Sequence, residues 1–308
     1  MKRICGGIFC VCVVWLATAA GRAQEQQPAA NPPEPQPTGQ PTTKLPPPLP
    51  PHPPDQIMPD EGRWSVGIFG WEPLGHPIMD AIPVQTFDIF GNPLPNTTPS
   101  SRIQMQGRPK VAPGVEVTAS AGKRHVIRVS LWRAKAAGNL TAPNDLLLWG
   151  GNYSQRDYLT MNYKLQNVKV SYEFLTWPYP VGSRKFRLKT LWQFQYVNMT
   201  TSFDAPLKST DSGPNTASGH KSVYAPTLGL APAYYVTPKF RLELDASGFA
   251  FPGRWNIWDA DASASYRIGK IEARIGAKAF HFRTSEKQDY FLRATMAGAY
   301  VGLRFYLN

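Results

Sequence analysis

The sequence predicts an all-β fold, a transmembrane antiparallel β-barrel, and three observations support this. From Arg63 onward, apolar and polar residues alternate with a period of two in one segment after another. The apolar positions of several segments are alanines, which would fill a packed core poorly but can face lipid. Aromatic residues gather near the ends of the segments, as they do at membrane interfaces.

The first 23 residues resemble a secretory signal peptide. Lys2 and Arg3 precede the apolar run 4–20, and Gly21-Arg22-Ala23 supplies small residues around a cleavage site. A membrane anchor is the weaker alternative, because the run is shorter than the roughly 20 residues that span a bilayer. We therefore expect residues 1–23 to be removed on export.

Cleavage after Ala23 would change both the cysteine content and the charge. All three cysteines (Cys5, Cys10 and Cys12) lie in the leader, so disulfides and thiolate chemistry are not expected in the mature chain. The net charge of +12 would fall to +9 with the loss of Lys2, Arg3 and Arg22. Such a surface favours anionic neighbours. Because the chain is exported, we expect lipopolysaccharide rather than nucleic acid.

Residues 24–60 form a separate region that holds 14 of the 31 prolines and few large apolar residues. This composition predicts a disordered or polyproline II spacer, with a reach on the order of 110 Å if fully extended. We interpret it as a periplasmic tether. Engagement of peptidoglycan or of a periplasmic protein is the alternative.

Residues 61–308 are predicted to form the barrel, and the stretch 156–177 illustrates the pattern. Leu159, Met161 and Tyr163 alternate with polar residues, and Val168, Val170, Tyr172 and Phe174 do so with the opposite phase. A two-residue turn at Gln166-Asn167 would bring both apolar sets onto one face. We therefore predict a hairpin of strands 156–165 and 168–177.

The same alternation predicts strands at 185–197, 239–251, 256–267 and 270–282. A turn at Ile268-Gly269 would place Asp259 across from Lys278 as an ion pair. The segment 222–236 also alternates, but Pro226 and Pro232 predict a bulge or kink within it.

A soluble sandwich or barrel is the alternative to a membrane barrel, with the apolar face turned inward. The small apolar residues and segment lengths of about 10–12 residues favour the membrane. The aromatic residues expected at its interfaces follow: Tyr158, Tyr163, Trp177, Tyr234, Trp255, Trp258 and Tyr266.

The last stretch, AGAYVGLRFYLN, has the composition of a strand that closes a barrel. An unpaired edge in a bilayer leaves backbone groups without partners. We expect Leu303 and Phe305 to face lipid and Tyr300, Arg304 and Tyr306 to face the lumen. Tyr300, Leu303, Phe305 and Tyr306 also resemble a C-terminal assembly signal for the barrel-assembly machinery.

Further strands are predicted at 63–72, 113–121, 124–135 and 292–307, which brings the total to eleven. Bacterial barrels usually have an even number. We predict twelve strands, with the twelfth at 102–108 or at 145–151, and keep ten as the alternative.

Several stretches resemble an uncharacterised family of bacterial outer-membrane β-barrel proteins of porin-like architecture. They are GRPKVAPG (107–114), KAAGNLTAPNDL (135–146), YKLQNVKVSYEFLTWPYP (163–180), RKFRLKTLWQFQY (184–196), ASGFAFP (246–252), IWDADASASYR (257–267) and AKAFHFRTS (277–285). The resemblance implies the fold and a Gram-negative outer-membrane location. It supplies no activity and no catalytic residues.

Signals for chemistry are weak. His281 lies close to Ser285, and Asp204, Asp211 and His220 share a loop, but neither set has the spacing of a known catalytic motif. No metal or cofactor motif is present, so we expect no enzyme activity. A membrane-embedded hydrolase is the third-ranked hypothesis.

The charges on the predicted lumen face are the better functional candidates. They are Arg187, Lys189, Arg241, Glu243, Asp245, Asp259, Asp261, Glu272, Arg274, Lys278 and Arg304. In a wide lumen these residues would set the field of a pore, and in a narrow one they would pair and fill it. The leading hypothesis is a narrow passive channel for small hydrophilic solutes. The alternative is a non-conducting barrel that stabilises the cell envelope.

Overall fold

The computed structural model describes residues 64–81, 88–90, 92, 101–107, 109–122, 124–178, 185–208, 214–285 and 290–307. The predicted leader and the proline-rich arm lie outside these residues, and so does Asp211. No helix among the described residues is long and apolar enough to cross a membrane.

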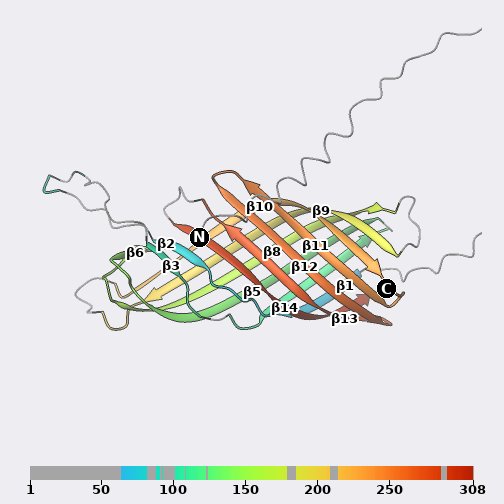
Figure 1. Cartoon of the computed structure of the whole chain (residues 1–308), viewed down its shortest axis with the longest axis horizontal. Helices are drawn as coiled ribbons and strands as arrows, with labels where there is room; N and C mark the ends of the chain where they lie inside the picture. Colours follow the sequence, from blue (N-terminus) through green and yellow to red (C-terminus); the bar gives the residue numbers. More distant parts are fainter. Residues whose placement is uncertain are drawn as a thin grey trace, which may run out of the picture. The chain divides into compact units, whose positions relative to one another are not determined.

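Ten antiparallel strands form a closed ring (Figure 1). In ring order they are β1 (Trp64–Trp71), β4 (Ala112–Ala121), β5 (His125–Thr141), β8 (Tyr158–Trp177), β9 (Phe186–Asp204), β10 (Thr216–Tyr235), β11 (Phe240–Phe251), β12 (Trp255–Ile268), β13 (Ile271–Arg283) and β14 (Phe291–Leu307). The terminal strand β14 pairs with β1 from Trp64–Leu307 to Trp71–Tyr300. This pairing leaves no open edge in the ring, as the alternating apolar and polar residues of the last stretch predicted.

In the part of the chain that the structure describes, four short strands lie outside the ring. They are β2 (Ile78–Ala81), β3 (Ser101–Gln104), β6 (Leu146–Leu148) and β7 (Gly151–Tyr153). Strand β2 continues the line of β1 along β14 and pairs with β3, while β6 and β7 form a separate hairpin. Short strands therefore occur at both places predicted for the twelfth strand, but the ring itself closes with ten.

The predicted hairpin at Gln166-Asn167 is wrong. Strand β8 runs unbroken from Tyr158 to Trp177 and pairs with β5 along its length, with Lys135 opposite Lys164 and Leu131 opposite Val168. The apolar residues change phase within a continuous strand. The apolar residues before position 166 therefore face the lumen, and the apolar residues after it face outward.

The hairpin of β12 and β13 exists, but its predicted register is wrong. Its turn is Gly269-Lys270, where Gly269 has φ +58°, and Ile268 pairs with Ile271. Lys278 therefore lies opposite Asp261, and Phe280 lies opposite Asp259. The bulge or kink expected in β10 does not disturb its ladder with β9, which keeps one register from Thr216 to Tyr234. The ladder with β11 is interrupted at Ala231 and Pro232 and resumes at Ala233 in the same register, because proline lacks the N–H that a ladder hydrogen bond needs.

An apolar belt surrounds one half of the barrel. On β9 the outward residues are apolar from Phe186 to Tyr196, apart from Thr190, and polar from Asn198 to Asp204. On β10 the outward residues from Tyr234 back to Tyr224 are all apolar or aromatic, and the next outward residue, Ser222, is polar. Ten residues of a strand tilted by about 40° rise roughly 25 Å, which matches the apolar band of a membrane barrel.

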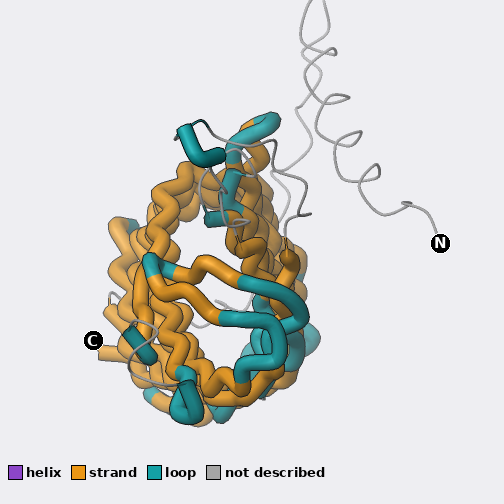
Figure 2. Tube along the Cα trace, turned by 90° about the vertical axis from the view of Figure 1, so that its left-hand side faces the viewer, coloured by secondary structure: helices purple, strands orange, loops and turns teal. Residues whose placement is uncertain are grey.

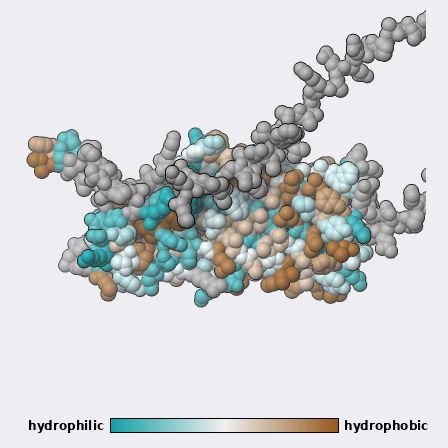
Figure 3. Space-filling model, viewed as in Figure 1, coloured by the Kyte–Doolittle hydropathy of each residue, from teal (hydrophilic) through white to brown (hydrophobic). Residues whose placement is uncertain are grey.

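The belt lies at the end of the barrel that carries the short turns. In Figure 3 the brown residues gather toward the right-hand part of the barrel, and the teal residues gather toward the left-hand part. Trp177, Tyr234 and Tyr266 mark the short-turn edge of the belt, while Tyr196, Tyr224 and Trp258 mark the other edge. Tyr163, predicted to be an interfacial residue, instead points inward and is buried.

Candidate functional site: the filled lumen

The lumen contains three layers of buried side chains, each supplied by several strands. We call them the charge layer, the amide layer and the aromatic layer, in order from the short-turn end. Each layer includes contacts between strands that are not neighbours in the ring. The distances across the lumen therefore decide whether solutes could pass.

The charge layer has Arg128 at its centre. Its guanidinium lies 2.7 Å from Glu173 Oε1 on the neighbouring strand β8, and 2.9 Å from Asp245 Oδ2 on β11, across the lumen. Glu243 lies 3.8 Å away, and Lys189 contacts the other oxygen of Glu173 at 3.3 Å. Charges buried this deeply are tolerated only when they are paired, and Arg128 satisfies several carboxylates at once.

A second part of the charge layer surrounds Glu116 and Glu272. Glu116 accepts a hydrogen bond from Arg304 and lies 3.5 Å from Arg274. Glu272 accepts from Arg241 at 3.1 Å, and its other oxygen accepts from the Tyr306 hydroxyl at 2.8 Å. Strands β4, β11, β13 and β14 are thereby connected through side chains as well as through the wall.

Asp259 organises the amide layer. Its carboxylate accepts from Lys169 Nζ at 2.5 Å, from Gln195 Nε2 at 3.0 Å and from the Ser247 hydroxyl at 2.5 Å. Asn167 in turn donates to Gln195 Oε1 at 3.0 Å. The bonds from Lys169 and Gln195 reach from β8 and β9 to β12, so they cross the lumen.

The aromatic layer lies above the amide layer, toward the long-loop end. Trp132 makes edge contacts with Trp71, at 4.9 Å between ring centroids, and with Phe280, at 5.0 Å. Leu165 and Met199 are fully buried in the same cluster. Burial of large apolar side chains and edge-to-face ring contacts are typical of a protein core.

The hairpin of β6 and β7 folds across the long-loop end of the ring. Figure 2 looks onto this end and shows a strand pair lying across the opening. Leu146 and Leu148 are buried, and the Trp149 indole donates to Thr201 of β9 at 2.7 Å. Trp149 has φ +50° and stacks on Tyr290 at 4.1 Å. A bulky residue rarely adopts this backbone conformation, so these contacts hold the hairpin tip in place.

Burial in the hairpin also changes the pKa of one side chain, Tyr153. It raises the pKa of the Tyr153 hydroxyl to about 12, with a smaller contribution from the Asp204 carboxylate. Tyr153 therefore stays neutral across the physiological pH range, and its hydroxyl donates to the Phe203 carbonyl at 3.4 Å.

The structure places the predicted lumen charges on the inner face. Lys189, Arg241, Glu243, Asp245, Asp259, Asp261, Glu272, Arg274, Lys278 and Arg304 all take part in the ion pairs of the two polar layers. Arg187 lies over the ring of Tyr235 at 4.9 Å. Sequence reasoning missed Glu116, Arg128, Lys169 and Glu173, although each alternates with outward apolar residues in the same way.

The terminal strand separates its residues as its alternation predicted. Leu303 and Phe305 are exposed on the outer face, whereas Tyr300 and Tyr306 are buried in the lumen. Their role as an assembly signal stays a prediction.

The weak catalytic candidates do not come together in the described part of the chain. The ring nitrogens of His281 contact Thr295 Oγ1 at 2.7 Å and Asn256 Oδ1 at 2.9 Å, while Ser285 donates to the Gly253 carbonyl at 3.3 Å. His220 lies on the outer face of β10, opposite Thr200. Among the described residues, no group of three acidic, histidine or cysteine side chains could hold a metal ion.

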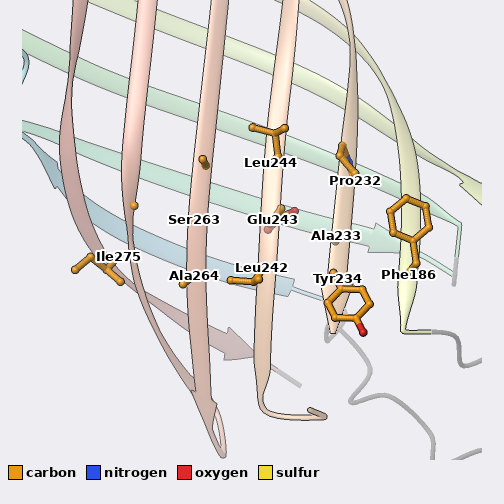
Figure 4. A pocket seen from close by; sticks show the side chains of 12 residues that line it. Phe186, Pro232, Ala233, Tyr234, Leu242, Glu243, Leu244, Ser263, Ala264 and Ile275 are labelled. Atoms are coloured by element: carbon orange, nitrogen blue, oxygen red, sulfur yellow. The ribbon is translucent and has the colours of Figure 1, made fainter. Parts of the chain in front are cut away.

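A shallow groove of about 560 Å³ runs along the outer wall within the apolar belt (Figure 4). Its lining includes the small Ala264 of β12 and the larger residues Phe186 of β9, Tyr234 of β10 and Ile275 of β13. Because the groove opens on the belt, lipid chains can fill it.

The closed ring, the apolar belt and the polar inner face define a transmembrane antiparallel β-barrel of the outer-membrane type. No family model matches this chain, and no curated protein does.

Several solved outer-membrane barrels are similar to the chain at low identity. The outer membrane protease OmpT from Escherichia coli is 9% identical, covering 79% of this chain and 97% of its own, with a TM-score of 0.49. The transport unit of the autotransporter AIDA-I from Escherichia coli is 9% identical, covering 82% and 93%, with a TM-score of 0.37. The toluene transporter TodX from P. putida is 8% identical, covering 81% and 91%, with a TM-score of 0.32.

Proposed function

We propose that the protein is a non-conducting outer-membrane barrel that anchors the chain in the envelope and holds a rigid extracellular end. The observation that carries this proposal is the set of side-chain contacts across the lumen. Arg128 reaches from β5 to Asp245 on β11, Gln195 reaches from β9 to Asp259 on β12, and Trp132 reaches from β5 to Phe280 on β13. A solute would have to break a charged, an amide and an aromatic layer in succession.

The positions of the turns support one orientation of the barrel in the membrane. Trp64 and Leu307 are paired at the same end as the two-residue turn of β12 and β13. Short turns of outer-membrane barrels face the periplasm. The arm that precedes Trp64 would therefore enter the periplasm, where it could tether the barrel to peptidoglycan or to a periplasmic protein. The long strands β5, β8, β9 and β10 would project their upper halves outside the cell.

Single-channel conductance in a planar bilayer tests the proposal. We expect no discrete current steps from refolded mature protein whose folding is shown by heat-modifiable gel mobility, whereas an open porin in the same bilayer gives steps. Reproducible, ion-selective steps from the folded protein would overturn the proposal and support the passive-channel hypothesis. In that case Arg128 and Asp259 would be the first residues to substitute, because each makes contacts across the lumen, Arg128 in the charge layer and Asp259 in the amide layer.

A further inference from the structure

A group of basic side chains lies on the outer face, just above the apolar belt on β5 and β8. Leu131 is the last outward apolar residue of β5, and the next two outward positions are Arg133 and Lys135. On β8, Val168 is the last outward apolar residue, and Gln166 and Lys164 follow. We call Arg133, Lys135 and Lys164 the basic rim.

Two members of the basic rim face each other directly. Lys135 and Lys164 are cross-strand partners, and residues so placed on one face have Cβ atoms about 5 Å apart. Lys110 adds a further positive charge nearby, since its backbone amide donates to the Lys135 carbonyl at 3.4 Å. Like charges in this arrangement destabilise a sheet unless an anion lies between them.

No acidic side chain among the described residues forms an ion pair with the basic rim. The Arg133 guanidinium contacts the neutral Gln166 Oε1 at 3.5 Å. The outward neighbours on β9, Asn198 and Thr200, are also uncharged. By contrast, the buried cations of the charge layer each have a carboxylate partner, so an anion that binds the rim would not have to displace an existing ion pair.

The height of the basic rim matches a layer of lipid phosphates. Arg133 lies two residues and Lys135 four residues beyond Leu131, which places them roughly 5 and 10 Å above the apolar edge on a tilted strand. This is the depth of the headgroup region of a bilayer. Basic residues next to a membrane recognise anionic lipid headgroups at about this distance.

We propose that the basic rim binds the phosphate groups of lipopolysaccharide in the outer leaflet. The long side chains of Lys135 and Lys164 can both reach one phosphate, and Arg133 can donate to a second or to the same group. The bound anion would remove the repulsion between the two lysines. This inference does not depend on whether the lumen conducts.

The first test compares affinity for lipopolysaccharide in detergent. The variant is Arg133→Gln/Lys135→Gln/Lys164→Gln in the full mature chain. The matched control is Lys185→Gln/Lys239→Gln/Lys270→Gln, which removes the same charge from exposed positions at the short-turn end. We expect the rim variant to bind roughly ten- to hundredfold more weakly, and the control to bind within about twofold of the unmodified protein. Equal affinity for all three proteins would overturn the proposal.

The ligand source is tested with two further probes. Enzymatically dephosphorylated lipopolysaccharide should bind the unmodified protein and the rim variant equally, because the groups that distinguish them are gone. Inorganic pyrophosphate should compete weakly, since it lacks the lipid that holds the phosphates at the rim. Competition at the same concentration as lipopolysaccharide would show a general phosphate site and would overturn the assignment to a membrane lipid.

An independent test uses one substitution whose effect on the Tm should change sign when lipopolysaccharide is added. Lys164→Gln relieves the lysine repulsion, so in detergent without lipopolysaccharide we expect the Tm of the barrel to rise by about 1–3 °C. With saturating lipopolysaccharide the same substitution should lower the Tm relative to the unmodified protein, because a ligand contact is lost. A shift of the same sign under both conditions would contradict the proposal, and refolding failures are excluded by heat-modifiable mobility.

Discussion

The long strands β5, β8, β9 and β10 extend through both halves of the barrel, and their inner and outer faces exchange polarity between the halves. In the belt half, outward residues such as Phe194 and Leu228 are apolar and inward residues such as Arg128 and Asp259 are charged. In the half at the long-loop end, inward residues such as Leu165 and Met199 are apolar, and outward residues such as Asn198 and Ser222 are polar. The surrounding medium, lipid below and water above, determines which face of one continuous strand is apolar.

This difference shows that the interior of each half is stabilised in its own way. The belt half is held by ion pairs and amide hydrogen bonds, which work only when every partner is present. The half at the long-loop end is held by burial of apolar side chains, as in a soluble protein. Substitutions at matched positions should therefore have effects that depend on height along the barrel.

The largest effect is expected from Arg128→Ala. Its loss leaves the carboxylates of Glu173 and Asp245 buried with fewer partners, which should lower the free energy of unfolding by about 3–5 kcal/mol. The control is Arg133→Ala on the same strand, outward and above the belt, which should change stability by less than about 0.5 kcal/mol. Urea unfolding in detergent without lipopolysaccharide measures both. Similar losses for the two variants would contradict a paired lumen.

A smaller effect is expected when a charge is placed on the outer face. Leu228→Arg puts a guanidinium in the middle of the belt and should lower the stability in lipid vesicles by about 2–4 kcal/mol. Ser202→Arg lies on the outer face above the belt, opposite the uncharged Asn162 and Ser218, and should cost little. The outward residues indicate that the belt ends near Tyr196 and Tyr224. Equal costs for the two variants would contradict this boundary.

The smallest effect is expected at the hairpin of β6 and β7. Trp149→Ala removes the hydrogen bond to Thr201 and the contact with Tyr290, so the hairpin should open more often. We expect trypsin cleavage after Arg156 to become about tenfold faster, which corresponds to a loss of about 1.4 kcal/mol in closing the hairpin. Trp177→Ala, at the short-turn edge of the belt and far from the hairpin, is the control and should leave cleavage unchanged. An unchanged rate for Trp149→Ala would mean that the indole does not hold the hairpin.

The strands that lie almost entirely within the belt were the ones predicted well from sequence. On β12, β13 and β14, one alternation extends through most of the strand, so inward charges such as Asp261, Glu272 and Arg304 were identified by phase alone. The register of β12 and β13 was less accurate, because Ile268-Gly269 and Gly269-Lys270 are both plausible two-residue turns.

The long strands were harder to predict because alternation alone does not show whether the apolar face contacts lipid or fills the lumen. In β8 the apolar phase changes between Leu165 and Val168, and this change was interpreted as a turn. A turn and a membrane edge produce the same change of phase in the sequence. One feature of the sequence does distinguish them: Gln166-Asn167 lacks the glycine that tight hairpin turns usually require. Glu173 and Lys169 alternate with the outward apolar residues of β8, but contacts across the lumen, such as Lys169 with Asp259, cannot be inferred from one strand.

The change of phase along β5, β8, β9 and β10 also has a mechanical consequence, since it gives the barrel a single depth of immersion. A downward shift by four residues would carry Lys135 and Lys164 into hydrocarbon, and an upward shift by the same amount would expose Phe194 and Leu131 to water. Both displacements are costly. A bilayer thicker or thinner than the belt must therefore adjust its own thickness around the protein, so that the barrel sets the local dimensions of the membrane that surrounds it.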